Sequence, residues 1–428
     1  MSPRRCPRWP AVLAATTLLL AAPACTSAQA PGHASVQVTP ATSQADQAVH
    51  ITVTGLDPGQ RATIVVASVD ADNVRWQSTD VYQASQAGVV DVDRTAPVSG
   101  SYRGAEGMGP VWSMTPAAGN GDPYYFWGQP PATFTVTVTA GGARIAQTSF
   151  DRTLPVAPYT ARAETLKADG FISEFYQPTG GSGRRPAVLY FGGSEGGAAS
   201  PLLGILLASH GYDALGLGYF GLPGLPSQLA DIPLEYFARA LRWLAAQPGV
   251  NPARIAVLGV SRGSEAAQLL GVHYPSLVHA VIASVPSNAA ICSYPDCNGP
   301  AWTFNGQPVP YASQIGHPVP SNSAAVISDQ KINGPTFLDC GEADRTWPSC
   351  PYAEAILNRL NASDDRWEHV LYSYPGAGHD IGSLVPYEPA SAPEQSEIVP
   401  SYPVIAEDEP VLWQHLLTFL ATFAASGN

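Results

Sequence analysis

Residues 254–270, RIAVLGVSRGSEAAQLL, carry the pattern from which we predict the fold of the larger part of this chain. Residues 255–258 are apolar and partly β-branched and follow a Pro-Gly and Asn-Pro turn cluster, which is typical of a buried parallel strand. From Ser264 to Leu270, alanine and leucine recur at helical spacing. The sequence therefore predicts a strand, a tight turn that carries Ser261, and a helix.

Glycines flank Ser261 in the motif Gly259-Val260-Ser261-Arg262-Gly263. A serine nucleophile at such a turn is strained and closely packed, so it needs small neighbours, and its hydroxyl is exposed above the sheet. The motif alone is weak evidence, because the chain has 40 glycines among 428 residues. The strand before it and the helix after it make Ser261 a candidate nucleophile.

A second copy of this pattern, Gly192-Gly193-Ser194-Glu195-Gly196, follows the strand-like residues 186–191. An oxyanion hole takes one N–H group from the residue after the nucleophile and one from a glycine-rich loop on an earlier strand. The earlier strand available to Ser194, in residues 160–176, has no such loop. We therefore predict Ser261 as the nucleophile and Arg262, Ser194 and Glu195 as the oxyanion residues. The alternative is that residues 192–197 form an ordinary strand-to-helix turn.

Two later loops carry a candidate acid and a candidate base. The strand-like residues 334–341 run into a polar loop with Glu342 and Asp344. We predict Asp344 as the acid, with Glu342 as the fallback, because a buried carboxylate after a late strand must hold the imidazole in one tautomer. His379 lies in a small-residue turn after residues 370–374 and is the predicted base. The alternative for His379 is a surface loop histidine.

Residues 36–153 predict a separate all-β domain, an immunoglobulin-like sandwich. Apolar and polar residues alternate there between Gly, Pro and Asp turns. The alternating apolar residues are Val36, Val38, Val49, Ile51, Val53, Ile64, Val66, Phe134, Val136 and Val138. Residues 154–159, with two prolines, form the expected linker.

Residues 160–428 predict a mostly parallel sheet covered on both faces, because apolar strands alternate there with amphipathic helices. Together with the chain order Ser261, Asp344, His379, this pattern predicts an α/β-hydrolase domain. Residues 286–327 are rich in Gly, Pro, Asn and aromatic residues and are predicted to cap the active site. The alternative is a disordered insertion.

The start of the chain predicts export. Three arginines precede an apolar run over residues 11–22, which is typical of a secretory signal and too short to span a bilayer. Cleavage after Ala30 would remove residues 1–30. The alternative is lipid attachment at Cys25. Either way, we expect a periplasmic, extracellular or surface-anchored protein.

Cysteine use and charge limit the partners. In an oxidising compartment the simplest pairing joins Cys292 to Cys297 and Cys340 to Cys350, and the second bridge would clamp the loop that carries Asp344. This spacing does not resemble a metal site.

The formal net charge of −13 becomes −16 without the three arginines of residues 1–30. Such a surface repels nucleic acid and anionic membrane headgroups.

Short motifs spread along the chain carry a family resemblance. They are HITVTGLDPG (50–59), WQS (76–78), GSY (100–102), MGPVWS (108–113), GGSEGG (192–197), GVSRG (259–263), AWTFNG (301–306), GEADRTWPS (341–349) and YPGAGH (374–379). With these motifs, the chain from about Val36 to Phe423 resembles the family of acyl-CoA thioesterases and bile acid-CoA:amino acid N-acyltransferases. The resemblance implies a β-sandwich followed by an α/β-hydrolase domain, and it places the family's triad on Ser261, Asp344 and His379.

The resemblance also bears on the reaction. Serine rather than cysteine at position 261 implies hydrolysis, whereas transfer to an amine goes with cysteine. The signal departs from the family, whose members meet coenzyme A inside cells, so acyl hydrolysis is the firmer implication than an acyl-CoA substrate.

The predicted function is that of an exported serine acyl hydrolase acting on a small-molecule acyl thioester or ester. His379 takes the Ser261 proton, Asp344 orients the imidazole, and water releases the acid from an acyl-enzyme. No metal or organic cofactor is implied, and the sequence indicates no oligomeric state. Two other classes are an acyltransferase that uses an amine or hydroxyl acceptor, and a non-catalytic surface-binding module.

Overall fold

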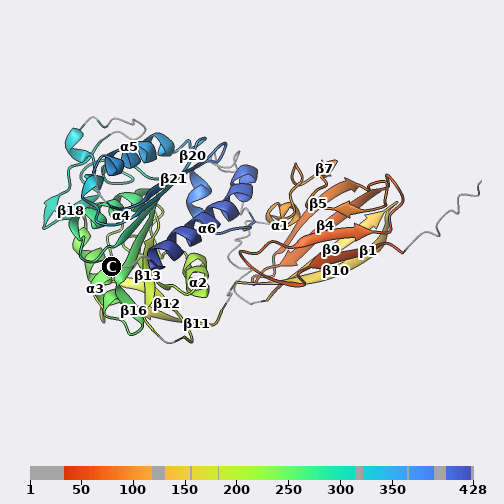
Figure 1. The fold of residues 1–428 in the computed structure, drawn as a ribbon, viewed down its shortest axis with the longest axis horizontal. Helices are drawn as coiled ribbons and strands as arrows, with labels where there is room; N and C mark the ends of the chain where they lie inside the picture. Colours follow the sequence, from red (N-terminus) through yellow and green to blue (C-terminus); the bar gives the residue numbers. More distant parts are fainter. Residues whose placement is uncertain are drawn as a thin grey trace, which may run out of the picture.

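The computed structural model describes residues 33–117, 131–154, 157–181, 183–313, 320, 322–363, 366–389 and 402–425. The predicted signal of residues 1–30, with Cys25 and Ala30, lies outside these described residues. The described chain forms two bodies, one built almost entirely of strands and one in which helices cover a twisted sheet (Figure 1).

The first body consists of strands in which every second residue is buried. In β4 (Arg61–Val69), Ala62, Ile64 and Val66 are buried between less buried neighbours, as the period of two in a strand requires. One sheet has the order β1 (Ser35–Thr39), β3 (His50–Thr54), β6 (Val90–Asp91), and the other has the order β2 (Thr42–Gln44), β10 (Ala143–Thr153), β9 (Ala132–Ala140), β4, β5 (Arg75–Gln83), β7 (Ser99–Gly100), with β8 (Thr115–Pro116) also beside β5. The apolar faces of the two sheets share one core, and a short helix, α1 (Gly109–Trp112), packs on β5.

The second body is built on one mixed sheet. Its strand order is β11 (Tyr159–Glu164), β12 (Ile172–Pro178), β14 (Asp213–Gly218), β13 (Arg185–Phe191), β16 (Val250–Val260), β17 (Ala280–Ser284), β20 (Thr336–Gly341), β21 (His369–Tyr374). The pairs from β14 to β21 are parallel, whereas β11 and β12 are antiparallel to their neighbours. The predicted α/β-hydrolase class is confirmed.

Five helices cover the two faces of this sheet. The buried apolar residues of α2 (Pro201–Ser209) and α6 (Tyr402–Ala425) belong to one core cluster, and most of those of α3 (Leu234–Ala245), α4 (Arg262–His273) and α5 (Ser349–Asn361) belong to another. In α3, residues three or four positions apart are fully buried, as an amphipathic helix on a sheet requires. Among the described helices, none has both the length and the apolar composition needed to cross a bilayer.

The predicted cap, residues 286–327, is packed over much of its length. It contributes β18 (Trp302–Phe304) and β19 (Gln307–Pro308) to a small sheet with β15 (Ile232–Pro233). Trp302 is buried, and a 3-10 turn follows at Ser323–Ala325. Residues 314–319 and 321 of the cap lie outside the described chain.

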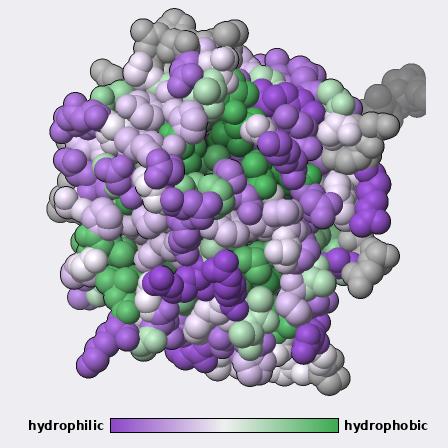
Figure 2. Space-filling view, turned by 90° about the vertical axis from the view of Figure 1, so that its left-hand side faces the viewer, coloured by the Kyte–Doolittle hydropathy of each residue, from purple (hydrophilic) through white to green (hydrophobic). Residues whose placement is uncertain are grey.

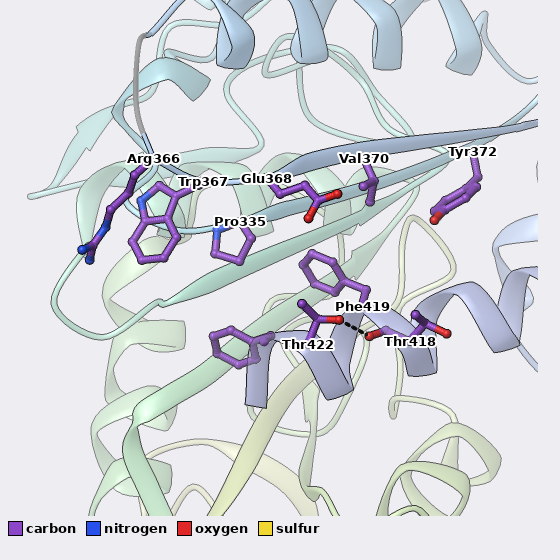
Figure 3. Close-up of a pocket in the computed structure, with 10 residues that line it drawn as sticks. Pro335, Arg366, Trp367, Glu368, Val370, Tyr372, Thr418, Phe419 and Thr422 are labelled. Carbon is purple, nitrogen blue, oxygen red and sulfur yellow. Dashed lines mark hydrogen bonds between the residues drawn. The ribbon is translucent and has the colours of Figure 1, made fainter. Parts of the chain in front are cut away.

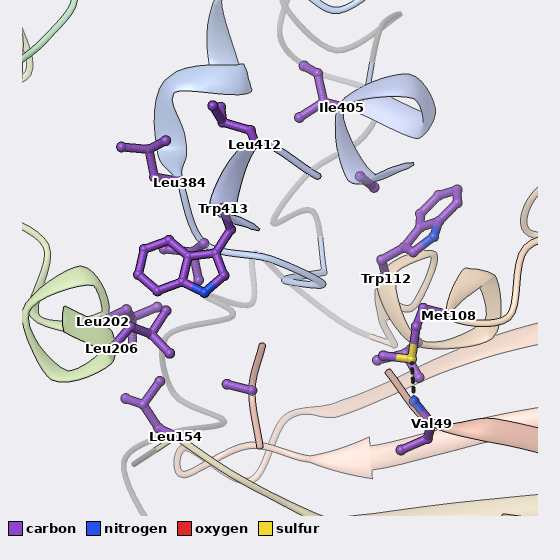
Figure 4. Packing of buried hydrophobic residues seen from close by; sticks show 14 of the residues in the cluster. Val49, Met108, Trp112, Leu154, Leu202, Leu206, Leu384, Ile405, Leu412 and Trp413 are labelled. Carbon is purple, nitrogen blue, oxygen red and sulfur yellow. Dashed lines mark hydrogen bonds between the residues drawn. The ribbon is translucent and has the colours of Figure 1, made fainter. Parts of the chain in front are cut away.

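The two bodies share a buried interface that the expected linker did not predict. Leu154, which ends the first body, is buried in a cluster with Leu202, Leu206 and Trp413 of the second (Figure 4). Asp46 of the first body accepts a hydrogen bond from Trp413 Nε1 at 3.0 Å and lies 2.6 Å from His210 Nε2. The sandwich is therefore docked onto α2 and α6.

The outer face of the second body, turned toward the viewer in Figure 2, is mixed in character. Hydrophilic residues surround a hydrophobic patch in the upper middle part of that face. Over both bodies together, the large hydrophobic residues that the described structure exposes are Val69 and Val98 in the first and Tyr294 and Val411 in the second.

Candidate active site

Ser261 lies at the junction of β16 and α4, on the turn that the sequence predicts. Its backbone has φ 54° and ψ −122°, a region that residues with a side chain rarely adopt. The flanking glycines make the turn possible. A Cβ atom at Gly259 would lie 2.2 Å from the Gly263 carbonyl oxygen, and one at Gly263 would lie 2.3 Å from the Gly192 carbonyl oxygen.

His379 lies between Ser261 and Asp344. Its Nε2 atom is 2.8 Å from Ser261 Oγ, and its Nδ1 atom is 2.8 Å from Asp344 Oδ2. His379 begins a 3-10 turn after β21, and Asp344 follows β20, so three parallel strands bring the side chains to one edge of the sheet. The structure thus brings together three residues that lie up to 118 positions apart.

The site is shielded from water. The side chain of His379 is 13% exposed and that of Asp344 only 1%, and Ser261 is buried. The second oxygen of Asp344 accepts hydrogen bonds from the Thr346 and Trp347 backbone N–H groups at 2.9 and 3.2 Å. The Trp347 ring stands edge-on to the imidazole, with ring centres 5.3 Å apart. These contacts orient both the carboxylate and the imidazole.

Residues 192–197, the glycine loop, lie against Ser261. A Cβ atom at Gly193 would be 2.8 Å from Ser261 Cβ, so only glycine allows this approach. The Gly193 N–H donates to Glu195 Oε1 at 2.8 Å, so the amide of Gly193 is already engaged. The loop thus lies beside Ser261, and its part in an oxyanion hole stays a prediction. Ser194 makes no contact with a histidine among the described residues.

Arg262 is the first residue of α4, so its N–H has no acceptor inside the helix. This leaves the amide next to Ser261 available to an oxyanion.

The sequence did not reveal Tyr219, whose hydroxyl donates to the carbonyls of Gly192 and Gly193 at 3.0 and 2.8 Å. Those bonds hold the two carbonyls of the loop in place.

Two family models match this chain. The model of the acyl-CoA thioester hydrolase/BAAT N-terminal region matches residues 46–164, and the model of the BAAT/acyl-CoA thioester hydrolase C-terminal region matches residues 232–299 and 302–404. The chain belongs to the acyl-CoA thioester hydrolase/BAAT family. Each body of the structure overlaps one of these matches, and residues 165–231 of the second body lie outside both.

Individual relatives align with most of this family member. Acyl-coenzyme A thioesterase 3 of Mus musculus is 28% identical over 87% of this chain and 90% of its own length. Acyl-coenzyme A amino acid N-acyltransferase 1 of Mus musculus is 26% identical over 82% of this chain and 86% of its own. Among solved structures, a bacterial heroin esterase is 18% identical, with a TM-score of 0.42, over 64% of this chain and 86% of that one.

The predicted cysteine pairs lie at bonding distance in this member of the family. Cys292 and Cys297 have an S–S distance of 2.06 Å, and Cys340 and Cys350 have one of 2.10 Å. The second pair spans the loop that carries Asp344. Among the described residues, no group of three His, Cys, Asp or Glu side chains is arranged to hold a metal ion.

A cavity of about 320 Å³ lies between β21 and α6, on the edge of the sheet (Figure 3). Its lining includes the rings of Trp367, Phe419 and Phe423. The lining residues come mainly from β21 and the end of α6, and they include none of Ser261, Asp344 and His379. The cavity is therefore separate from the candidate active site.

A buried carboxyl supports the Ser261 turn from within the sheet. Asp339 of β20 accepts a hydrogen bond from Ser284 Oγ at 2.7 Å, and the Ser284 carbonyl accepts the Ser261 N–H at 3.0 Å. Burial raises the pKa of Asp339 to about 7, although the bond from Ser284 opposes this shift.

This shift predicts a pH dependence of stability. A raised pKa means that the folded protein binds the proton more tightly than the unfolded chain, so stability is gained at low pH and lost as the pH rises through about 7. We expect Asp339→Asn to remove that loss, so its free energy of unfolding should improve relative to the native protein between pH 5 and pH 8. Urea unfolding at both pH values measures this; an unchanged difference between the two proteins would contradict it.

Proposed function

We propose that this protein hydrolyses acyl thioesters or esters through an acyl-enzyme formed on Ser261. The observation that carries the proposal is the pair of 2.8 Å contacts that link Ser261, His379 and Asp344. A serine hydroxyl becomes nucleophilic when an oriented imidazole takes its proton. Membership of a family of acyl-CoA thioester hydrolases and acyltransferases supports the same acyl chemistry.

The reaction would proceed in two halves. Ser261 Oγ attacks the acyl carbonyl carbon while His379 Nε2 takes the hydroxyl proton, and His379 then gives this proton to the leaving thiol or alcohol. Water attacks the acyl-enzyme with His379 again as the base, which releases the acid and restores Ser261. Asp344 accepts a hydrogen bond from Nδ1 and stabilises the imidazolium. The N–H groups of Arg262 and the glycine loop would bind the oxyanion.

Two neighbouring carboxylates, Glu342 and Asp344, differ in their position relative to His379, and only one of them can orient its imidazole. Glu342 is exposed, and the structure describes no contact between it and His379, whereas the Asp344 side chain is buried against the imidazole. We expect Asp344→Asn to lower kcat by about 10² to 10⁴, because an amide permits the wrong imidazole tautomer. Glu342→Gln is the matched control and should retain turnover. Steady-state kinetics of both variants measure the difference; the reverse ranking would exchange the two roles.

We propose further that the protein is exported. The charged and apolar regions of residues 1–30 support this, and so do two cysteine pairs at bonding distance, since such bridges persist in oxidising compartments. Mass measurement of the protein recovered from the expressing cell would show either loss of residues 1–30 or a lipid on Cys25. An unprocessed chain recovered from the cytoplasm would contradict export.

The substrate class is open to a direct test. Relatives named as acyl-coenzyme A thioesterases suggest acyl thioesters, whereas an exported enzyme would meet esters or other thioesters instead. A hydrolysis screen of the purified protein over acyl-CoA thioesters, simple acyl thioesters and p-nitrophenyl esters distinguishes these. Turnover of at least one class that disappears in Ser261→Ala supports the proposal. No turnover of any class would favour a non-catalytic binding module.

Acyl transfer is the second candidate, because one relative is named as an amino acid N-acyltransferase. Serine at position 261 favours hydrolysis, since an oxygen ester passes its acyl group to amines less readily than a thioester does. Adding an amino acid such as glycine to the same assay, with product analysis by mass spectrometry, decides between the two. Formation of acyl-amine in place of free acid would establish transfer.

A further inference from the structure

A buried ion pair lies in the first turn of α4, the helix that follows Ser261. Arg262 Nε is 2.6 Å from Glu265 Oε1, and the two side chains are 4% and 0% exposed. Both residues belong to the first turn of α4. Neither side chain touches His379 or Asp344 in the contacts that the described residues make, so the proposed reaction does not use them.

The pair is bonded to both ends of residues 291–302, the first part of the cap. Arg262 Nη2 donates to the carbonyls of Ile291 and Cys292 at 3.0 and 2.8 Å. Glu265 Oε2 accepts from the Ile291 N–H at 3.0 Å and from Trp302 Nε1 at 2.8 Å. Both carboxylate oxygens of Glu265 therefore have partners.

The ion pair is connected to both predicted sets of oxyanion-binding N–H groups, that of Arg262 and those of residues 192–197. The main-chain N–H of Arg262 belongs to the same residue as the tethered guanidinium. Trp302 packs against the Tyr219 ring, with centres 5.8 Å apart, and the Tyr219 hydroxyl holds the carbonyls of Gly192 and Gly193. The ion pair thus includes the residue that carries one of these N–H groups, and it is linked to the glycine loop through Trp302 and Tyr219.

The same segment reaches the acid and the base. Ile291 and Cys292 form a buried cluster with Trp347 and Tyr352. The Trp347 ring stands against His379, and its backbone N–H binds Asp344. A displacement of residues 291–302 would therefore also shift Trp347, which contacts His379 and Asp344.

Stability alone does not account for such a pair. Removing two charges from water costs several kcal/mol, and well-packed apolar residues of similar size often give equal or greater stability. The five contacts given above hold the groups that the ion pair binds in a defined position. Oxyanion donors are sensitive to position, because their contribution requires alignment with the developing charge.

We propose that Arg262 and Glu265 are positioning residues that align the oxyanion-binding N–H groups with Ser261 by tethering residues 291–302 to the first turn of α4. This inference rests on the proposed acyl-enzyme mechanism. It predicts that loss of the tether slows acylation of Ser261 more than it weakens substrate binding, because the oxyanion forms only in the transition state.

The experiment compares Glu265→Gln with Asp329→Asn. Asp329 forms a similar ion pair with Arg359 at 2.6 Å, and Arg359 also donates to a cap carbonyl, that of Asn288, at 3.3 Å. That pair contacts neither Ser261 nor Trp302 in the described structure, so it controls for the loss of a buried carboxylate. Both variants should lose stability in urea unfolding.

The decisive measurement is the rate constant for labelling of Ser261 by a fluorophosphonate, together with kcat and KM for the best ester of the screen. We expect Glu265→Gln to slow labelling and kcat by about 10- to 100-fold with KM changed less than about threefold, whereas Asp329→Asn should stay near the native rate. Native labelling and turnover in Glu265→Gln, or equal slowing in both variants, would overturn the proposal.

A second variant addresses misfolding. Arg262→Met combined with Glu265→Leu removes both charges, so no unpaired charge remains buried and the fold should persist. The tether is still absent, and we expect slow labelling. A double variant that labels at the native rate would refute the positioning role. Failure of the proposed mechanism itself would appear differently, as a native protein that is not labelled at Ser261.

Discussion

Ser261→Ala should lower kcat by about 10⁶-fold and abolish labelling by a fluorophosphonate probe. The reason is that this serine hydroxyl lies 2.8 Å from Nε2 of His379, whose imidazole Asp344 orients. A folded variant is expected, because alanine can occupy the turn and the glycines around it are unchanged. Intact-mass analysis after labelling measures the covalent step, and ester hydrolysis measures turnover.

Ser194→Ala is the matched control for this prediction. Ser194 lies in the other G-x-S-x-G motif, and its main-chain N–H, the atom that the mechanism uses, survives the substitution. Labelling and most of the turnover should therefore remain. A probe that still labels Ser261→Ala, with the adduct on Ser194, would transfer the nucleophile role to the glycine loop.

His379→Ala should lower kcat by between about 10³ and 10⁶, because without the base the Ser261 hydroxyl stays protonated. The combined loss offers a sharper test. Residues that act as a unit are not additive, so Ser261→Ala with His379→Ala should be no slower than Ser261→Ala alone. Initial rates at saturating ester, measured for the two single variants and the double variant, provide this comparison.

His369→Gln is a suitable control, since His369 begins β21 whereas His379 follows its end. Its turnover should remain close to that of the native protein. Near-native turnover in His379→Ala would show that another histidine is the base.

The turn around Ser261 could be predicted because its signals are local. A short apolar run, flanking glycines and helical spacing lie within residues 254–270, and the structure forms β16, the strained Ser261 and α4 from them. Strand and helix periods are properties of neighbouring residues. The order of the strands in the sheet then brings Ser261 and His379 to one edge.

The structure shows which of two neighbouring carboxylates faces the imidazole of His379. Glu342 and Asp344 are two positions apart in a polar loop, and the sequence predicts Asp344 as the acid with Glu342 as the fallback. The structure buries the side chain of Asp344 against His379 and leaves Glu342 exposed. The direction of a side chain in a loop depends on the segments that pack around it.

Hydrophobic periods and turn residues that lie close together in the chain are enough to predict the α/β-hydrolase class, the strand-rich first body and the position of the Ser261 turn. The hydrogen bond of Trp413 to Asp46, 367 positions away, and that of Trp302 to Glu265, 37 positions away, are evident only in the folded chain. Buried polar groups must find partners wherever packing brings them. No local pattern encodes these partners, since the interface and the tether exist only once distant segments have been buried together.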